Sequence, residues 1–226
     1  MVKSWVVKQQ GDKGKVKELS EALNIDTTLA NLLVQRDVYS FEGAREFFRP
    51  SLDKLWDPFL MKDMELAVSR IARAIESKER IMVYGDYDVD GTSAVALVFT
   101  FLNSFHDNIT YYIPDRYIEG YGISVKGIDY AAETGVKLII ALDCGIKAIE
   151  RVKYATSLGI DFIICDHHRP GAELPSAVAV LDPKRPDCSY PFKELSGCGI
   201  GFKLVQAYAQ QNSIPFGQLI QYLDLV

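Results

Sequence analysis

Long apolar runs are missing from this sequence. No stretch approaches the ~20 apolar residues that a membrane-spanning helix needs. The N-terminal stretch MVKSWVVKQQGDKGK contains neither an apolar signal-peptide core nor a small-residue cleavage site. We therefore expect a cytoplasmic protein with no membrane partner. The hydrophobic content of 48% over 226 residues is still ample for a packed core.

Cysteine is scarce and never closely paired. The four cysteines stand at positions 144, 165, 188 and 198, and none forms a C-x-x-C pair. This spacing argues against a zinc site. Cys144 and Cys165 lie at the ends of apolar runs, so we interpret them as reduced, buried thiols.

An excess of positive charge is also missing. The formal net charge is −5, whereas contacts to nucleic-acid phosphates favour Lys and Arg. Five aspartates carry the same total charge, and they are Asp86, Asp88, Asp90, Asp143 and Asp166. If these side chains hold metal ions, the rest of the chain is neutral. The net charge therefore neither excludes nor favours a polyanionic substrate.

Residues 1–60 are predicted to form a small helical segment. Three stretches carry helical spacing: KVKELSEALN, DTTLANLLVQRD and SFEGAREFFRP. Ser40 is suited to cap the third helix and Pro50 to end it. The segment contains no dense cluster of catalytic residues, so we expect a docking or substrate-guiding element.

Residues 61–226 are predicted to form one α/β domain. An amphipathic helix, KDMELAVSRIARAIESKER, comes first, and then short apolar runs alternate with helical segments. The runs are 81–85, 109–113, 137–142, 161–165 and 177–181. Strands that are apolar on both faces and separated by helices indicate a five-stranded parallel sheet flanked by helices.

An aspartate follows every predicted strand, and in parallel sheets the ligand site lies at the carboxyl ends of the strands. Two histidines, His167 and His168, come directly after one of these aspartates. A single aspartate could belong to a turn, but converging carboxylates repel one another unless they share a cation. The carboxylates in question are Asp86, Asp88, Asp90, Asp115, Asp143, Asp166 and Asp182.

Carboxylates combined with imidazole suit Mn²⁺ or Mg²⁺. The number of candidate ligands exceeds what one ion needs, so we predict a two-metal site that activates water and stabilises a phosphoryl transition state. A helix predicted to begin near Thr92 would point its N-terminus at this edge and favour anions.

The stretch YGDYDVDGTS allows a second interpretation. In it, Asp88 would be a nucleophile that takes up a phosphoryl group, as in phosphatases of the haloacid-dehalogenase type. That mechanism needs Ser or Thr after the next core strand and then Lys. The later strands end instead in Asp143 and in Asp166-His167-His168, so the metal site is favoured. A trapped phospho-aspartate on Asp88 would restore the first interpretation.

Three motifs, YGDYDVDGT, ALDCGI and ICDHHRPG, resemble those of the DHH phosphoesterase superfamily. The segments DPFLMKDMELAVSRI, IPDRYIEGYGIS and AVLDPKRPDCSYPFKELSGCGIGFKL are similar to those of its RecJ-like single-strand-specific exonucleases. The resemblance implies a 5′-to-3′ exonuclease on single-stranded DNA, active in DNA repair and recombination, with Mn²⁺ or Mg²⁺ as cofactor. It also implies single-strand-binding protein and a helicase as partners.

The resemblance also implies roles for individual residues. It implies metal ligands at Asp86, Asp88, Asp90, Asp143 and His167. Asp86 and Asp166 would also act in catalysis, and His168 would donate a hydrogen bond to the scissile phosphate. Substrate contacts are implied at Arg116, Glu119, Gly120, Tyr121, Gly122, Arg169 and Gly199. Arg116 could equally brace the acidic cluster.

Two further alternatives stay open within the superfamily. One is a phosphoesterase for small substrates such as nano-RNA, 3′-phosphoadenosine phosphate or cyclic dinucleotides. The other is a catalytically silent scaffold, as in the eukaryotic replicative helicase assembly. In RecJ-like relatives a further metal-binding aspartate follows, then a second catalytic domain and an oligonucleotide-binding fold. We therefore expect this chain to be an N-terminal fragment, weakly active or inactive by itself.

Overall fold

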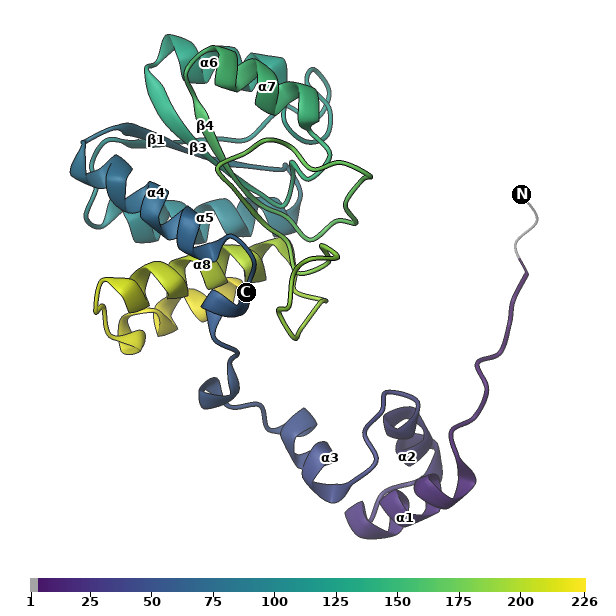
Figure 1. Cartoon of the computed structure of the whole chain (residues 1–226). Coiled ribbons are helices and arrows are strands. Elements are labelled where there is room, and N and C mark those ends of the chain that lie inside the picture. The colour runs from purple at the N-terminus through teal and green to yellow at the C-terminus, as the bar shows by residue number, and fades with distance from the viewer. Residues whose placement is uncertain (1–3) are drawn as a thin grey trace. The chain divides into compact units, whose positions relative to one another are not determined.

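The computed structural model describes residues 4–226. The chain divides into two compact units, Met1–Leu55 and Trp56–Val226 (Figure 1). This division falls five residues before the predicted boundary at residue 60. Within the described residues, no helix combines the length and the apolar character needed to cross a membrane.

The first unit contains the three predicted helices, α1 (Lys13–Leu23), α2 (Thr27–Val34) and α3 (Phe41–Phe48), followed by the short η1 (Leu52–Lys54). Ser40 caps α3 by accepting a hydrogen bond from the Gly43 N–H, as predicted, and α3 ends before Pro50. Its small apolar core is built from Leu19, Ala30, Leu33 and Val34.

The second unit is a five-stranded sheet with the order β2-β1-β3-β4-β5. Every neighbouring pair is parallel, which confirms the predicted fold class. The strands are β1 (Arg80–Gly85), β2 (Ile109–Tyr112), β3 (Val136–Leu142), β4 (Asp161–Cys165) and β5 (Ala179–Leu181). The helices are η2 (Pro58–Leu60), α4 (Met64–Glu76), α5 (Val89–Asn103), α6 (Val125–Glu133), α7 (Ile149–Ser157), α8 (Gly197–Gln211), η3 (Phe216–Gln218) and η4 (Ile220–Leu225).

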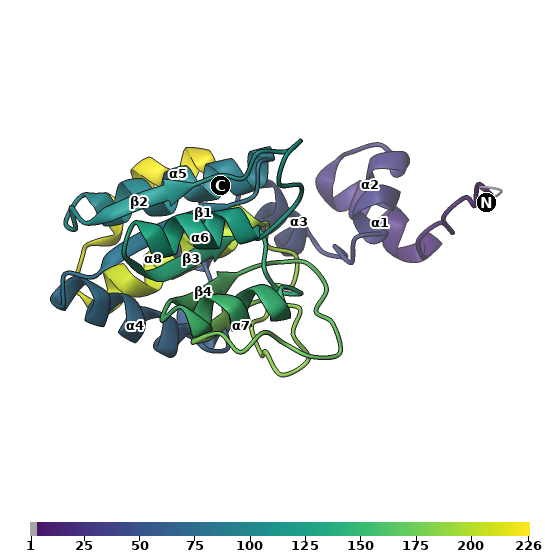
Figure 2. The ribbon, with the colours of Figure 1, turned by 90° about the horizontal axis from the view of Figure 1, so that it is seen from above.

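Helices cover both faces of the sheet (Figure 2). Because side chains alternate along a strand, Ile81 and Val83 of β1 pack with α4, α5 and α8, whereas Met82 and Tyr84 pack with α6 and α7. This double burial explains why the strands read as continuous apolar runs.

The strand order reverses at β1, which has β2 on one side and β3 on the other. In open α/β sheets a crevice forms at the carboxyl ends of the strands at such a switch point. Asp86 follows β1 and Asp143 follows β3, so these two aspartates flank the switch point.

One predicted helix start differs slightly from the structure. The helix expected near Thr92 begins at Val89, because Asp88 acts as its N-cap. The C-terminal stretch QLIQYLDLV contains the 3₁₀ segment η4. Gly135 and Gly159, which follow α6 and α7, both have positive φ, at 77° and 74°, as helix ends favour.

Candidate metal centre

The turn between β1 and α5 places two aspartates at the start of a helix. Asp88 Oδ1 accepts hydrogen bonds from the N–H groups of Asp90 (3.0 Å) and Gly91 (3.1 Å), so its other oxygen remains for a ligand. A Cβ at position 91 would lie 2.5 Å from the carbonyl oxygen of Asp86. Only glycine allows the helix to start this close to the strand end.

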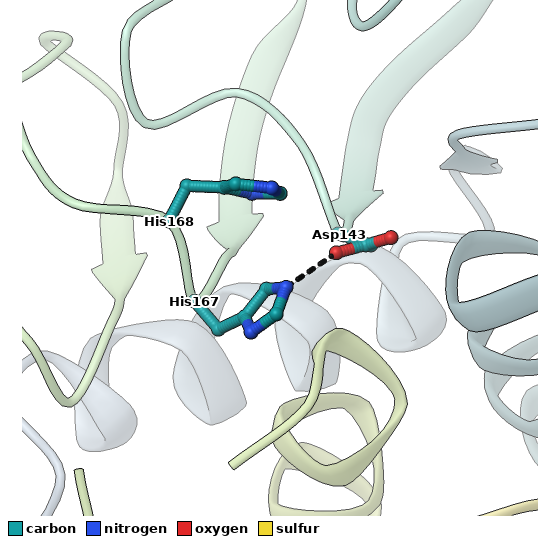
Figure 3. Close-up of side chains that lie close together, drawn as sticks. All are labelled: Asp143, His167 and His168. Atoms are coloured by element: carbon teal, nitrogen blue, oxygen red, sulfur yellow. Dashed lines mark ion pairs between the residues drawn. The ribbon is translucent and has the colours of Figure 1, made fainter. Parts of the chain in front are cut away.

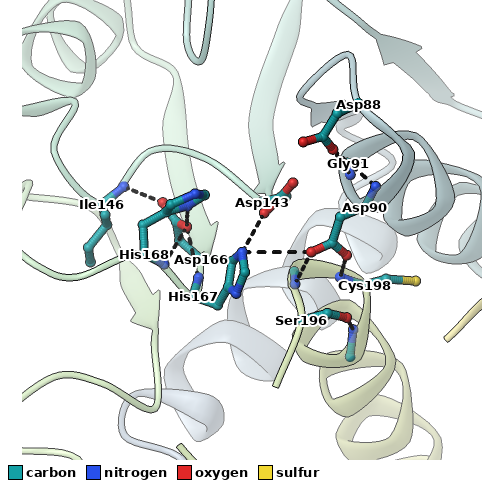
Figure 4. A network of polar contacts seen from close by, with 12 residues as sticks. Asp88, Asp90, Gly91, Asp143, Ile146, Asp166, His167, His168, Ser196 and Cys198 are labelled. Atoms are coloured by element: carbon teal, nitrogen blue, oxygen red, sulfur yellow. Dashed lines mark hydrogen bonds and ion pairs between the residues drawn. The ribbon is translucent and has the colours of Figure 1, made fainter. Parts of the chain in front are cut away.

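Asp90 connects α5 to the start of α8 (Figure 4). Its carboxylate accepts hydrogen bonds from the N–H groups of Gly197 (2.8 Å) and Cys198 (2.7 Å). A Cβ on Gly197 would lie 2.5 Å from the Cβ of Asp143, so the close approach of α8 requires glycine there. The resemblance had named Gly199 in this segment, as an implied substrate contact, and not Gly197.

Asp143 occupies a conformation that few non-glycine residues adopt, with φ at 58°. Its side chain is 2% exposed. Its Oδ1 is buried and accepts no hydrogen bond of sound geometry among residues 4–226, although His167 Nε2 lies 3.1 Å away (Figure 3). The same nitrogen lies 3.7 Å from Asp90 Oδ2. One imidazole therefore lies between the carboxylate of Asp90, in the first turn of α5, and that of Asp143, after β3.

Asp143 lies close enough to four of the other predicted aspartates for their charges to affect its pKa. Burial first, and then the negative charges of four neighbouring aspartates, raise the pKa of Asp143 to about 8. Those four are Asp90, Asp88, Asp166 and Asp86. A carboxyl with such a pKa is largely protonated at neutral pH unless a cation binds it. Metal binding at Asp143 would therefore release this proton.

Asp86 is fully buried. Its Oδ1 accepts a hydrogen bond from the Gly122 N–H at 3.2 Å, while its Oδ2 has no partner among residues 4–226. Burial raises the pKa of Asp86 as well. An unpartnered buried oxygen is costly, and a cation would satisfy it.

Asp166 has a different environment, because both of its oxygens accept hydrogen bonds. Oδ1 accepts from the N–H groups of His167 (2.8 Å) and His168 (3.1 Å) and lies 2.7 Å from His168 Nδ1. Oδ2 accepts from the Ile146 N–H at 2.9 Å. These contacts make Asp166 the group that orients the two histidines, rather than a free ligand.

The ring of His168 is held between two groups. Nδ1 faces Asp166, and Nε2 lies 3.2 Å from the Tyr121 hydroxyl. Asp143, His167 and His168 form a group whose ligand atoms all lie within 4.8 Å of one another. The structure therefore brings these three predicted residues together most tightly. Asp86, Asp88 and Asp90 surround them without entering that group.

The predicted substrate loop, residues 116–122, is largely braced by its own contacts. Glu119 accepts hydrogen bonds from the Tyr112 hydroxyl (2.9 Å), the Asp115 N–H (2.9 Å) and the Ser124 hydroxyl. It therefore shapes the loop. Gly120 and Gly122 have positive φ. Arg116 lies over the Tyr87 ring, 5.2 Å from its centroid, and makes no ion pair among residues 4–226.

Two other predicted contacts have contrasting environments. Arg169 is exposed. Gly199 is buried, and its N–H donates at 3.0 Å to the hydroxyl of Ser196, the N-cap of α8, so this N–H is not free for a ligand. The N–H groups of Gly122 and Ile146 could not be predicted as carboxylate partners, because only the tertiary fold brings them to Asp86 and Asp166.

The donor set fits small divalent cations. Carboxylate oxygens predominate, one imidazole nitrogen lies among them, and two buried oxygens, Asp86 Oδ2 and Asp143 Oδ1, have no hydrogen-bond partner among the described residues. Hard oxygen ligands suit Mg²⁺ and Mn²⁺, and imidazole favours Mn²⁺ of the two.

A parallel α/β sheet with this acidic edge defines the class, and comparison with known proteins defines the family. The family described as "DHH family, N-terminal domain" matches residues 80–226. The chain belongs to the DHH family. The triad that carries the family name is Asp166-His167-His168.

Similar proteins are single-stranded-DNA-specific exonucleases. The chain is 45% identical to RecJ of Bacillus subtilis, over 90% of this chain and 26% of that protein. It is 34% identical to RecJ of Escherichia coli, over 93% of this chain and 38% of that protein. The chain thus spans about a quarter to two fifths of these relatives.

Solved structures agree in fold. An exonuclease RecJ bound to manganese superposes with a TM-score of 0.66 at 28% identity, over 73% of this chain and 41% of that one. RecJ of Thermus thermophilus in complex with Mn²⁺ superposes with a TM-score of 0.73 at 23% identity, over 96% of this chain and 30% of that one.

Proposed function

We propose that the chain is the metal-binding part of a 5′-to-3′ exonuclease that hydrolyses single-stranded DNA with Mn²⁺ or Mg²⁺. The observation that carries the proposal is the group formed by Asp143, His167 and Asp90, in which a buried carboxylate oxygen faces an imidazole without a hydrogen bond of its own. The 45% identity to a RecJ exonuclease supports the substrate class.

In this proposal the metal ligands are Asp86, Asp88, Asp90, Asp143 and His167. Divalent ions bound there would supply an activated water and offset the charge that develops on the phosphate. Hydrogen bonds from the protein hold two of these carboxylates in place, because N–H groups of α8 bind Asp90 and the Gly122 N–H binds Asp86. Such preorganisation avoids reorganisation cost during the reaction.

His168 is proposed to bind the scissile phosphate through Nε2. Its Nδ1 faces Asp166, so a donor at Nε2 as well requires the imidazolium form, whose charge Asp166 offsets. The Tyr121 hydroxyl lies 3.2 Å from the same nitrogen. Water attacks phosphorus, the P–O3′ bond breaks, and the products are a nucleoside 5′-monophosphate and a strand with a new 5′ phosphate.

The test is hydrolysis of single-stranded DNA labelled at either end, with Mn²⁺ or Mg²⁺ present. We expect slow, distributive release of mononucleotides from the 5′ end, no cleavage of duplex DNA, and loss of release in His168→Ala. Release from the 3′ end or equal cleavage of a duplex would contradict the proposal. Faster hydrolysis of a dinucleotide than of a long strand would indicate a small-substrate phosphoesterase instead. Single-strand-binding protein and a helicase remain predicted partners.

A further inference from the structure

A pocket of about 290 Å³ opens beside His168. Two loops form its walls, residues 121–123 before α6 and residues 145–148 before α7. Ile123, Ile146 and Ala148 contribute apolar surface, and Tyr121 and His168 contribute rings. A volume near the lower end of ligand pockets, about 300 Å³, suits a single nucleotide unit rather than a folded oligomer.

The pocket and the metal centre lie on opposite sides of His168. Ile146, in the pocket wall, lies on one side of the His168 ring, and His167 and Asp143 lie on the other (Figure 4). A phosphodiester strand that places one phosphate at His168 Nε2 therefore has the pocket available for the next unit. Asp166 lines the pocket, but both of its oxygens already accept hydrogen bonds.

Two exposed cations, Lys147 and Arg151, line the pocket. Neither forms an ion pair with any carboxylate among residues 4–226, whereas the acidic residue between them, Glu150, pairs with Lys153 at 2.9 Å. Two cations free of carboxylate partners beside an acidic metal centre suit the negatively charged group of a ligand.

We propose that this pocket is a nucleotide subsite, in which Lys147 and Arg151 bind the phosphate next to the one that reacts. The inference rests on the proposed function and adds to it the recognition of a second phosphate. It explains why an acidic chain can bind a polyanion: the cations are few, but two of them lie where the strand continues beyond His168.

The test uses thymidine 3′,5′-bisphosphate, which contains no phosphodiester bond for the proposed exonuclease to hydrolyse. In the presence of Mg²⁺, calorimetry should show that wild-type chain binds it about tenfold more tightly than thymidine 5′-monophosphate or 3′-monophosphate, because charge-assisted contacts contribute on that scale. In Lys147→Gln/Arg151→Gln this advantage should fall to about twofold or less. The matched control, Lys78→Gln/Lys137→Gln, loses the same charge from two exposed lysines outside the pocket and should keep the advantage.

The outcomes separate the two proposals. Equal affinity of wild-type chain for the bisphosphate and both monophosphates would overturn the subsite, and so would an equal loss in the control variant. If the bisphosphate advantage depends on Lys147 and Arg151 but single-stranded DNA is not hydrolysed, the subsite stands and the proposed exonuclease fails. If both variants hydrolyse DNA with the KM of wild-type chain, the subsite fails and the exonuclease stands.

Discussion

The two ends of the sheet treat charge in opposite ways. At the amino ends of the strands, Arg70 is 4% exposed and pairs with Asp161 of β4 at 2.6 Å and with Glu79 at 2.7 Å. At the carboxyl ends, carboxylates converge and three buried oxygens lack hydrogen-bond partners among residues 4–226: Asp86 Oδ2, Asp143 Oδ1 and Asp182 Oδ2. The same sheet therefore has one end whose charges are neutralised by the protein and one end that needs a ligand to neutralise them.

The charges at the amino end stabilise the fold, whereas those at the carboxyl end are suited to bind a ligand. Removing one partner of a buried ion pair destabilises the fold, whereas removing one carboxylate from a cluster of like charges relieves repulsion and lowers ligand binding. Substitutions of the same chemical kind should consequently have opposite effects at the two ends.

The largest expected effect is on metal affinity at the carboxyl end. Asp143→Asn should weaken Mn²⁺ binding by about 100-fold or more, because metal ligands matter at least as much as the groups that orient them. Calorimetric titration with Mn²⁺ measures this. Asp161→Asn, which changes an aspartate at the amino end, serves as the control. Equal weakening by both substitutions would show that the two ends do not differ.

The next effect is on stability at the amino end. Arg70→Met should lower the free energy of unfolding by about 2 kcal/mol, less than for a fully buried pair because Asp161 and Glu79 are partly exposed. Urea denaturation measures it. Arg73→Met is the matched control, because Arg73 lies 3.9 Å from the same Asp161 oxygen but is 63% exposed. The control should cost less than about 0.5 kcal/mol. A comparable loss in both would refute the distinction.

The pH dependence of stability should also separate the ends. The pKa of Asp143 is raised to about 8, so the folded chain binds this proton more tightly than the unfolded chain does. Stability without metal should therefore fall by roughly 1–2 kcal/mol as pH rises from 6 to 8. Asp182, whose burial raises its pKa to about 6, contributes mainly below that window.

Urea denaturation in EDTA at several pH values measures this slope. Asp143→Asn should remove most of it and stabilise the metal-free chain at pH 8, while Asp161→Asn should leave it unchanged. If the free energy of unfolding of Asp143→Asn still fell over the same pH range, groups other than Asp143 would be responsible.

Sequence alone predicted the strands, the helices between them and the acidic edge, because these follow from local periodicity and from the rule that places ligands at carboxyl strand ends. The sequence could not predict which aspartates accept hydrogen bonds from backbone N–H groups. Asp166 looked like Asp143 in sequence, yet the fold surrounds only Asp166 with N–H donors. The contact between Asp90 and Gly197 joins residues 107 positions apart, and no local pattern reports it.

The smallest expected effect tests how tightly α8 must approach the acidic edge. A Cβ on Gly197 would lie 2.6 Å from Asp143 Oδ1, so Gly197→Ala should displace either α8 or the Asp143 carboxylate. We expect a loss of about 1 kcal/mol in stability and a several-fold loss in Mn²⁺ affinity. Gly199→Ala is the matched control on the same helix, since its Cβ would approach no atom more closely than the end of the Leu195 side chain, at 3.3 Å. Because alanine has better helix propensity than glycine, the control should be neutral or stabilising. If Gly197→Ala were also neutral or stabilising, the close contact between α8 and Asp143 would not be needed to position the Asp143 carboxylate for metal binding.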